Sequence, residues 1–449
     1  MQKRALLDSS VYLGLLALIV WLPLPLGSNR DWSMGLLVLL VGLLAMLWAA
    51  ARLRQQKPVS RALRAAWPML ALLLAAQVWV ALQLLLGISL DVGASFQYLM
   101  LGLAYSLLFV MVLSVFHTRR RLTALLAVLV ASGTVQAFYG TLMTLSGLEW
   151  TFFTEKTSYR GLATGTFVNR NHLAGYLELT LACGIGLLMA LRDGGSFSWK
   201  AILELIMGPK ARLRIGLVIM VIGLVMSRSR MGNTAFFISL VVIGGIFILL
   251  NKENRVRNII LLASFVLIDI LMISQYFGLD KLKDRLINTR FEDQVVNEVV
   301  VARQNEVRDD VYLQALPTLE QHWLTGSGAG SFEAVFPQYM GPDIAVMHFD
   351  HAHNDFIQFA IEYGLIGTLP LAAFVLLAFW HALRALWRTE SWYRSGVGFA
   401  AAMGILALMI HSFTDFNLQI PANAATFVVL CAIAVLANQH DKERKQRRG

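Results

Sequence analysis

The chain has 449 residues, of which 57% are hydrophobic and only 15% are charged. Soluble domains contain about 45–50% apolar and about 25% charged residues. Apolar runs of close to twenty residues recur along the whole chain, so a soluble enzyme, a disulfide-stapled secreted domain and a disordered protein are excluded. The net charge is +10, but the basic residues form short clusters between apolar runs. This pattern indicates membrane topology, so no nucleic acid is expected as a partner.

A helix that crosses about 30 Å of hydrocarbon needs about 20 mostly apolar residues. The sequence therefore predicts an all-α polytopic membrane protein of about twelve transmembrane helices. We expect these helices at 10–27, 33–51, 66–86, 96–116, 122–146, 172–191, 212–227, 231–250, 258–278, 364–386, 395–412 and 421–438. If both termini are cytoplasmic, most of the 38 Lys and Arg residues fall in cytoplasmic segments, as the positive-inside rule requires.

This topology divides the chain into four parts. Residues 1–278 hold the first nine spans, and 279–355 form one long periplasmic loop. Residues 356–438 hold an interfacial helix and the last three spans, and 439–449 form a basic cytoplasmic tail. The loop is far longer than the usual connection of about 4–6 residues, and long loops on a rigid scaffold often carry function.

The strongest functional candidate is the sequence HFDHAHNDFIQFAIEYGLIG, at 348–367. Asp355, Gln358 and Glu362 follow helical spacing, which predicts a helix at the outer interface with Asn354 or Asp355 as its N-cap. His353 would then lie at the mouth of the bundle. There a neutral imidazole could accept a proton from a sugar hydroxyl.

Two other interpretations of this segment remain open. Its polar residues could be solvated loop residues, with Asp355 acting only as a cap. Alternatively, His351, His353 and Asp355 have the spacing of a zinc-hydrolase run, although Phe356 stands where a further histidine normally follows. We expect no metal and no cofactor.

Arginine is the second candidate group. Arg228 and Arg230 interrupt two apolar runs at the outer face, within MSRSRMGN. They oppose the positive-inside trend, and arginine near lipid is normally paired or functional. Guanidinium binds phosphate oxygens bidentately, so these residues suit a diphosphate. The competing interpretation is that both side chains reach the lipid headgroups.

Other polar residues gather at the outer ends of predicted spans. Candidates for binding phosphate or sugar, or for simply capping helices, are Arg170, Asn171 and His172 in GTFVNRNHLAG, and Arg308 and Tyr312 in the long loop. His411, Asp415 and Asn417 polarise the end of the eleventh span, and Asp269 lies within the ninth. The sequence leaves the roles of Asp269 and Asp415 open.

These motifs resemble those of the O-antigen ligase and O-antigen polymerase superfamily of bacterial surface-polysaccharide assembly. The family pattern is His, then Asn, Ser or Gln, nine residues, Gly, two residues, and Gly, Thr or Tyr. His353-Asn354 and Gly364-Leu365-Ile366-Gly367 satisfy it. SRSRMG is similar to the family's Ser-Arg-Gly segment, with Met231 inserted before Gly232. Arg308 and Tyr312, upstream of GSGAGSF, are similar to the family's loop arginine and Gly-rich turn.

The resemblance implies a GT-C-like membrane glycosyltransferase that is inverting and independent of metal. Such an enzyme moves a glycan from undecaprenyl diphosphate to an acceptor hydroxyl at the periplasmic face of the bacterial inner membrane. It implies His353 as the base and Arg230 and Arg308 on the diphosphate. Arg228, Asn354, Arg170, Asn171, His172 and Tyr312 are expected to bind substrate.

The expected partners are the lipid-linked glycan donor, a glycan or lipid A-core acceptor and membrane lipids. Other polysaccharide-assembly proteins are further candidates. The sequence does not separate a polymerase for O-antigen or exopolysaccharide from an O-antigen ligase or a protein glycosyltransferase. A transporter or flippase is the main alternative, since twelve spans and intramembrane charges also suit transport. A scaffold subunit of an envelope complex is the third.

Overall fold

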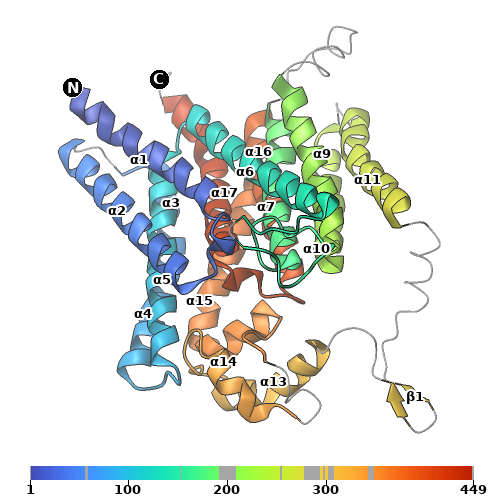
Figure 1. Cartoon of the computed structure of the whole chain (residues 1–449). Coiled ribbons are helices and arrows are strands. Elements are labelled where there is room, and N and C mark those ends of the chain that lie inside the picture. Colours follow the sequence, from blue (N-terminus) through green and yellow to red (C-terminus); the bar gives the residue numbers. More distant parts are fainter. Residues whose placement is uncertain are drawn as a thin grey trace.

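The computed structural model describes residues 2–55, 59–152, 154–191, 209–252, 255–277, 294–296, 299–301, 308–341 and 348–446. These residues form a bundle of long helices (Figure 1). Helix α1 begins, and the last long helix ends, at the same end of the bundle. The described part of the long loop lies at the opposite end, beneath the helices.

Every predicted span falls on a helix. The twelve helices are α1 (Gln2–Trp21), α2 (Asp31–Gln55), α4 (Trp67–Leu85), α5 (Val92–Val115), α6 (Arg119–Ser146), α7 (Arg170–Ala190), α9 (Pro209–Ser227), α10 (Arg230–Leu250), α11 (Arg255–Phe277), α15 (Asp355–Leu386), α16 (Trp392–His411) and α17 (Pro421–Gln446). Within the described residues, nine of them are long and apolar enough to cross a membrane, all except α1, α9 and α11. The prediction of an all-α polytopic membrane protein is confirmed, and the count of twelve stays a prediction.

The remaining elements are short and lie mostly at the end of the bundle that carries the long loop. They are η1 (Leu26–Ser28), α3 (Arg61–Ala65), β1 (Gln294–Val296), β2 (Val299–Val301), α13 (Arg308–His322), α14 (Phe332–Val335), η3 (Phe336–Tyr339) and η4 (Asn417–Gln419). Strands β1 and β2 pair antiparallel within the long loop. Helices α13 and α14 pack against the start of α15.

Helices α7, α16 and α17 form the centre of the bundle. The apolar windows of α7 and α17 are completely buried, whereas less than a third of the residues in those of α2 and α15 are buried. Small residues allow α7 and α16 to approach closely: a Cβ at Gly186 would lie 2.5 Å from the carbonyl oxygen of Gly396. Close backbone contact of this kind is a usual way to pack helices in a membrane, where apolar burial offers little driving force.

Helix α15 contains a sharp break at Gly364. This glycine has φ 60° and ψ −175°, a conformation that side chains with a Cβ rarely adopt. A Cβ there would also lie 2.4 Å from the backbone of Gly326 and of Leu324. The break therefore separates a short outer helix, which begins at Asp355, from the span that follows, and it seats the Gly-rich turn at 326–330 against the helix.

Candidate functional site

The segment that carries His353 is fixed to the connection between α16 and α17. Asn354 caps α15 by accepting a hydrogen bond from the Ile357 N–H, and its amide donates to the Phe413 carbonyl at 2.9 Å. The Asp355 carboxylate is buried and accepts hydrogen bonds from Ser412 Oγ at 2.7 Å and from the Leu418 N–H at 3.1 Å. Asn354 and Asp355 are therefore structural anchors, and for these two residues the interpretation as solvated loop is wrong.

One aromatic ring gathers three histidines. The ring centroid of Phe416 lies 4.7 Å from that of His172, 4.2 Å from His351 and 4.9 Å from His353. His172 comes from the first turn of α7, whereas the other two precede α15. Phe416 thus brings together residues that are far apart in the chain and fixes the planes of their rings relative to one another.

Helix α13 joins the long loop to this cluster. The Tyr312 hydroxyl donates a hydrogen bond of 2.9 Å to the carbonyl of His353. Arg308, the first residue of α13, lies one turn before Tyr312, and its side chain is outside the described residues. The backbone at Arg308 is therefore close to the His353 segment, while the direction of the guanidinium stays untested.

Hydrogen bonds from Gln358 fix the protonation state of His351. The Gln358 carbonyl oxygen accepts from the Ala352 N–H at 3.1 Å, so its amide nitrogen faces His351 Nδ1, at 2.9 Å. That nitrogen must then be an acceptor, as in a neutral imidazole. Burial lowers the pKa of His351 to about 4, against a smaller opposing effect of Asp350, which favours the same neutral form.

The rest of the helical stripe supports the Gly-rich turn. The Glu362 carboxylate is buried, and it accepts hydrogen bonds from the Gly330 N–H at 2.9 Å and from the Gln358 amide at 3.0 Å. The predicted stripe of Asp355, Gln358 and Glu362 therefore exists. It faces the protein interior, where it connects the α15 start to the loop.

A second polar group lies deeper, between α7 and α16. Glu178 Oε1 and His411 Nδ1 are 2.7 Å apart, and both side chains are completely buried. One and a half turns nearer to the start of α7, His172 Nε2 lies 3.6 Å from Asp415 Oδ1. Buried carboxylates are costly unless they are paired, so both contacts tie α7 to the end of α16.

The arginine segment packs on the same face of α7. Ser229 is buried and caps α10 by accepting from the Gly232 N–H, while Arg228 and Arg230 on either side are exposed. A Cβ at Gly232 would lie 2.6 Å from Ala174 Cβ and 3.2 Å from Glu178 Oε1. Only glycine lets the first turn of α10 lie this close to Glu178.

The start of α7 is partly structural. Asn169 caps the helix through the Asn171 N–H at 2.8 Å, and Asn171 itself is buried. Arg170 is half-buried, with its guanidinium carbon 5.9 Å from the centre of the Tyr159 ring. Among the predicted binding residues Arg170, Asn171 and His172, the ring of His172 packs against Phe416.

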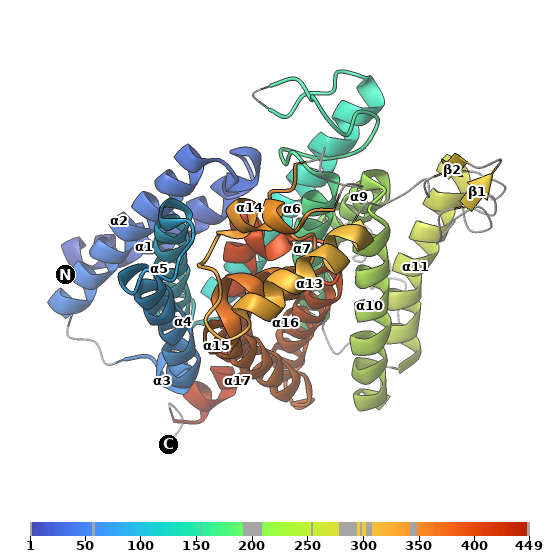
Figure 2. The same cartoon turned by 90° about the horizontal axis from the view of Figure 1, so that it is seen from below.

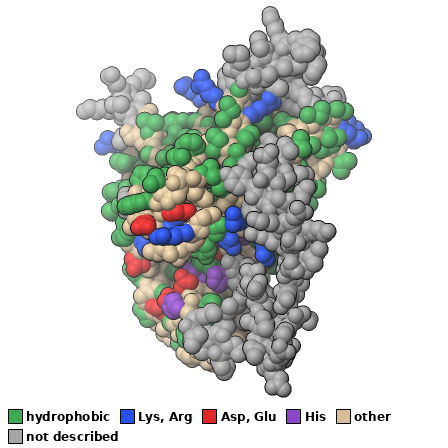
Figure 3. All heavy atoms as spheres, turned by 45° about the vertical axis from the view of Figure 1, so that its right-hand side comes forward, with side chains coloured by type: hydrophobic (Ala, Val, Ile, Leu, Met, Phe, Trp, Pro, Cys, Tyr) green, Lys and Arg blue, Asp and Glu red, His purple; other side chains and the backbone are tan. Residues whose placement is uncertain are grey.

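The predicted residues therefore fall into three groups. His353 and His172 pack against Phe416, and Tyr312 and Asn354 hold the segment that carries His353. Arg228 and Arg230 lie on either side of Ser229, which caps α10. The first turn of α10 packs against α7 near Glu178, and α7 also carries His172 of the first group. The Arg308 side chain and Asp269 lie outside the described side chains. On one face, Lys and Arg, Asp and Glu, and His side chains gather below a mainly hydrophobic surface (Figure 3).

The metal interpretation finds no support in the described residues, where no three His, Cys, Asp or Glu side chains are arranged to hold a metal ion. Asp355 faces Ser412 and Leu418 instead of the two histidines. Sequence reasoning missed Phe416, Gln358 as the partner of His351, and Glu178. Glu178 carried a usable signal, because it is the only acidic residue of its span and intramembrane charges are often functional.

Comparison with known proteins agrees with the motifs. No curated protein sequence matches the chain. Residues 215–372 match the O-antigen ligase family, a range that includes the arginine segment, Tyr312 and His353 but not the start of α7. That family consists of glycosyltransferase-like ligases and polymerases that act on lipid-linked glycans and polysaccharide acceptors. This match supports a place for the chain in the O-antigen ligase and polymerase superfamily of surface-polysaccharide assembly, and its apolar helices are those of a polytopic membrane protein.

Proposed function

We propose that this protein transfers a glycan from undecaprenyl diphosphate to an acceptor hydroxyl at the periplasmic face of the inner membrane. The observation that carries the proposal is the set of contacts around His353. Tyr312 of the long loop holds its carbonyl and Phe416 packs against its ring. An imidazole fixed in this way, at the outer end of a membrane bundle, suits a base for a substrate that arrives on a lipid.

In the proposed reaction the acceptor oxygen attacks C1 of the donor sugar. The bond between C1 and the diphosphate oxygen breaks, and its electron pair leaves with the diphosphate. The acceptor proton passes to the His353 imidazole, which must lie within about 3 Å of that hydroxyl. Attack from the side opposite to the leaving group inverts the configuration at C1.

Negative charge develops on the diphosphate as it departs. Arg230 and Arg308 would offset this charge, with Arg228 or Arg170 assisting, because guanidinium groups stay charged and bind phosphate oxygens bidentately. Arg228 and Arg230 are exposed to an incoming ligand. Since arginines can neutralise the leaving group, the proposed reaction needs no divalent metal.

Purified protein with undecaprenyl-diphosphate glycan tests this function. We expect release of undecaprenyl diphosphate and a new glycosidic bond, both unaffected by a chelator. Movement of the lipid-linked glycan between leaflets without a new bond would instead identify a flippase. Loss of transfer on chelation would contradict the metal-independent mechanism while leaving the transferase function intact. Supplying either lipid-linked repeats or lipid A core as acceptor separates a polymerase from a ligase.

A further inference from the structure

The connection after α6 differs from the other described loops in where it lies. We call residues 147–162 the interfacial loop. Viewed from below, α6 and this loop extend from the side of the bundle rather than across its outer end (Figure 2). The loop lies beside α6, contacts the start of α7 through Tyr159 and Arg170, and leads to Ala163 at the end of α9. A segment that leaves a membrane bundle sideways enters the surrounding lipid.

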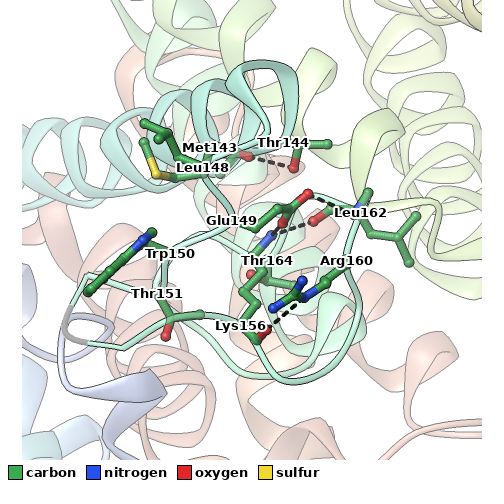
Figure 4. Close-up of polar contacts among 12 residues, drawn as sticks. Met143, Thr144, Leu148, Glu149, Trp150, Thr151, Lys156, Arg160, Leu162 and Thr164 are labelled. Carbon is green, nitrogen blue, oxygen red and sulfur yellow. Dashed lines mark hydrogen bonds and ion pairs between the residues drawn. The ribbon is translucent and has the colours of Figure 1, made fainter.

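The interfacial loop has a defined fold (Figure 4). Lys156 Nζ lies 2.6 Å from Glu149 Oε2, with the Lys156 side chain buried, and it also donates to the Leu162 carbonyl at 2.8 Å. The other Glu149 oxygen accepts from the Gly161 N–H at 2.7 Å. This buried ion pair holds both ends of the loop together, so its outer surface is preformed.

The loop also neutralises its own charge. Besides the Lys156–Glu149 pair, its two remaining charged residues, Arg160 and Glu155, form an ion pair at 2.6 Å. All four charged residues in 147–162 are therefore paired within the loop. Charges that are paired are far less costly to bring to a boundary of low dielectric than isolated ones.

The part of the loop that follows α6 exposes three apolar side chains, whereas the part around Thr157 exposes polar ones. Leu148 is 60% exposed, Trp150 47% and Phe152 54%. They continue an exposed stripe on α6 formed by Val135, Phe138, Leu142 and Leu145. These four positions follow i, i+3, i+7 and i+10 spacing, so they share one face of the helix. Because α6 is a candidate span, that face is the one in contact with lipid.

Hydrogen bonds to Tyr139 set the depth of the exposed apolar residues Trp150 and Phe152. The Tyr139 hydroxyl donates to the Trp150 carbonyl at 3.1 Å and accepts from the Phe152 N–H at 2.8 Å. Tyr139 precedes the end of α6 at Ser146 by seven residues, which corresponds to about 10 Å along the helix. The chain therefore turns back along α6, and Trp150 and Phe152 lie beside the membrane-spanning part of the helix.

We infer that the interfacial loop is embedded in the outer leaflet of the bilayer, with Leu148, Trp150 and Phe152 at the boundary between headgroups and acyl chains. Tryptophan and other aromatic residues favour this boundary. The partner is the phospholipid surface. The loop continues to Ala163, whose N–H donates to the Met226 carbonyl at 3.0 Å, two residues before Arg228. Its insertion therefore sets the height of the arginine segment relative to the lipid phosphates.

Spin labelling in vesicles of phosphatidylethanolamine and phosphatidylglycerol tests this inference. A nitroxide is attached to Trp150→Cys or Phe152→Cys, with Thr157→Cys as the matched control, because Thr157 is an exposed polar residue of the same loop. We expect labels at 150 and 152 to collide several times more often with oxygen than with a water-soluble nickel chelate, and the label at 157 to show the reverse.

Two outcomes would overturn the inference. Labels at 150 and 152 that behave like the one at 157 would show that these two positions face water. Labels shielded from both reagents would show that protein covers them. Tryptophan fluorescence of the unlabelled chain gives a check that needs no cysteine variant. Lipids brominated near the headgroup should quench this fluorescence more strongly than they quench the fluorescence of Trp150→Phe. Neither measurement depends on transferase activity.

Discussion

The two halves of the candidate site are built in different ways. The histidine half is held rigidly, because hydrogen bonds fix the Ala352 N–H and the His353 carbonyl, and the rings of Phe349 and Phe416 pack against the imidazole. In the arginine half Ser229 is buried, whereas Arg228 and Arg230 on either side of it are exposed at the N-terminus of α10. A base must be oriented to within hydrogen-bond geometry, whereas a phosphate clamp needs reach. The contrast indicates that the fold fixes the orientation of the proposed base, whereas the arginine side chains take up theirs when the substrate binds.

The largest effect should come from removing the oriented base. We expect His353→Ala to lower the rate of glycan transfer by about 10²–10⁴-fold, the usual contribution of general base catalysis, with little change in thermal stability. The measurement is release of undecaprenyl diphosphate from the lipid-linked donor. His348→Ala is the control, since His348 is exposed and its Nε2 contacts only Glu333 among the ion pairs of the described residues. Equal activity of both variants would remove His353 from the mechanism.

The second-largest loss of transfer rate should come from changes to the proposed diphosphate clamp. Arg230→Ala should lower the rate by about 10²–10³-fold, which is typical when one group that stabilises developing charge is lost. Arg230→Lys should recover only part of the rate, because ammonium keeps the charge but not the bidentate geometry. Arg120→Ala, an exposed arginine at the start of α6, should be active. If Arg230→Lys were fully active, the proposed bidentate contact would be wrong.

The buried link between the halves should affect stability before activity. Removing one partner of a buried ion pair costs about 3–5 kcal/mol, so Glu178→Ala should lower the melting temperature in detergent clearly. Glu178→Gln can still accept a hydrogen bond from His411, and the expected loss is smaller. A cycle with His411→Ala measures the coupling between the two side chains. Additive losses in that cycle would show that the 2.7 Å contact carries no energy.

A smaller effect is expected where α10 meets α7. A Cβ at Gly232 overlaps Ala174 and Ser229, and overpacking of this kind costs about 1–3 kcal/mol. Gly232→Ala should therefore lower stability and reduce activity by moving Arg230. Gly245→Ala on the same helix is the matched control, because no atom lies within 4 Å of the Cβ that it adds. A Gly232→Ala protein as stable and active as Gly245→Ala would contradict the close packing.

The smallest effect concerns pH. Burial lowers the pKa of His351 to about 4 in the folded protein, whereas a histidine in the unfolded chain has a pKa near 6.5. Between these two pH values the unfolded chain binds a proton at His351 and the folded protein does not. The contribution of His351 to stability is therefore lost progressively as pH falls from about 6.5 toward 4. His351→Gln should melt with a shallower dependence on pH over this range. An unchanged dependence would show that His351 titrates normally.

Much of the fold follows from the sequence, because the length of an apolar run fixes the length of a membrane helix. The capping role of Asn354 and the stripe through Glu362 also follow from local spacing. The contacts around Phe416 do not: they depend on how α7, α16 and α15 pack, and a phenylalanine in an apolar context gives no signal. The pairing of Glu178 with His411 joins two helices far apart in the chain, and the identity of a partner at that separation is not encoded locally.

Helix α7 has a consequence for how such proteins diversify. This buried helix contacts Phe416 and Asp415 near its start and the first turn of α10 further along. It therefore fixes the distance between the imidazole of His353 and the guanidinium groups of the arginine segment. On the proposed mechanism, the distance between the base and the diphosphate clamp is then set inside the membrane. If the proposed mechanism holds, the long loop could be exchanged for one that admits a different acceptor without a change in that distance.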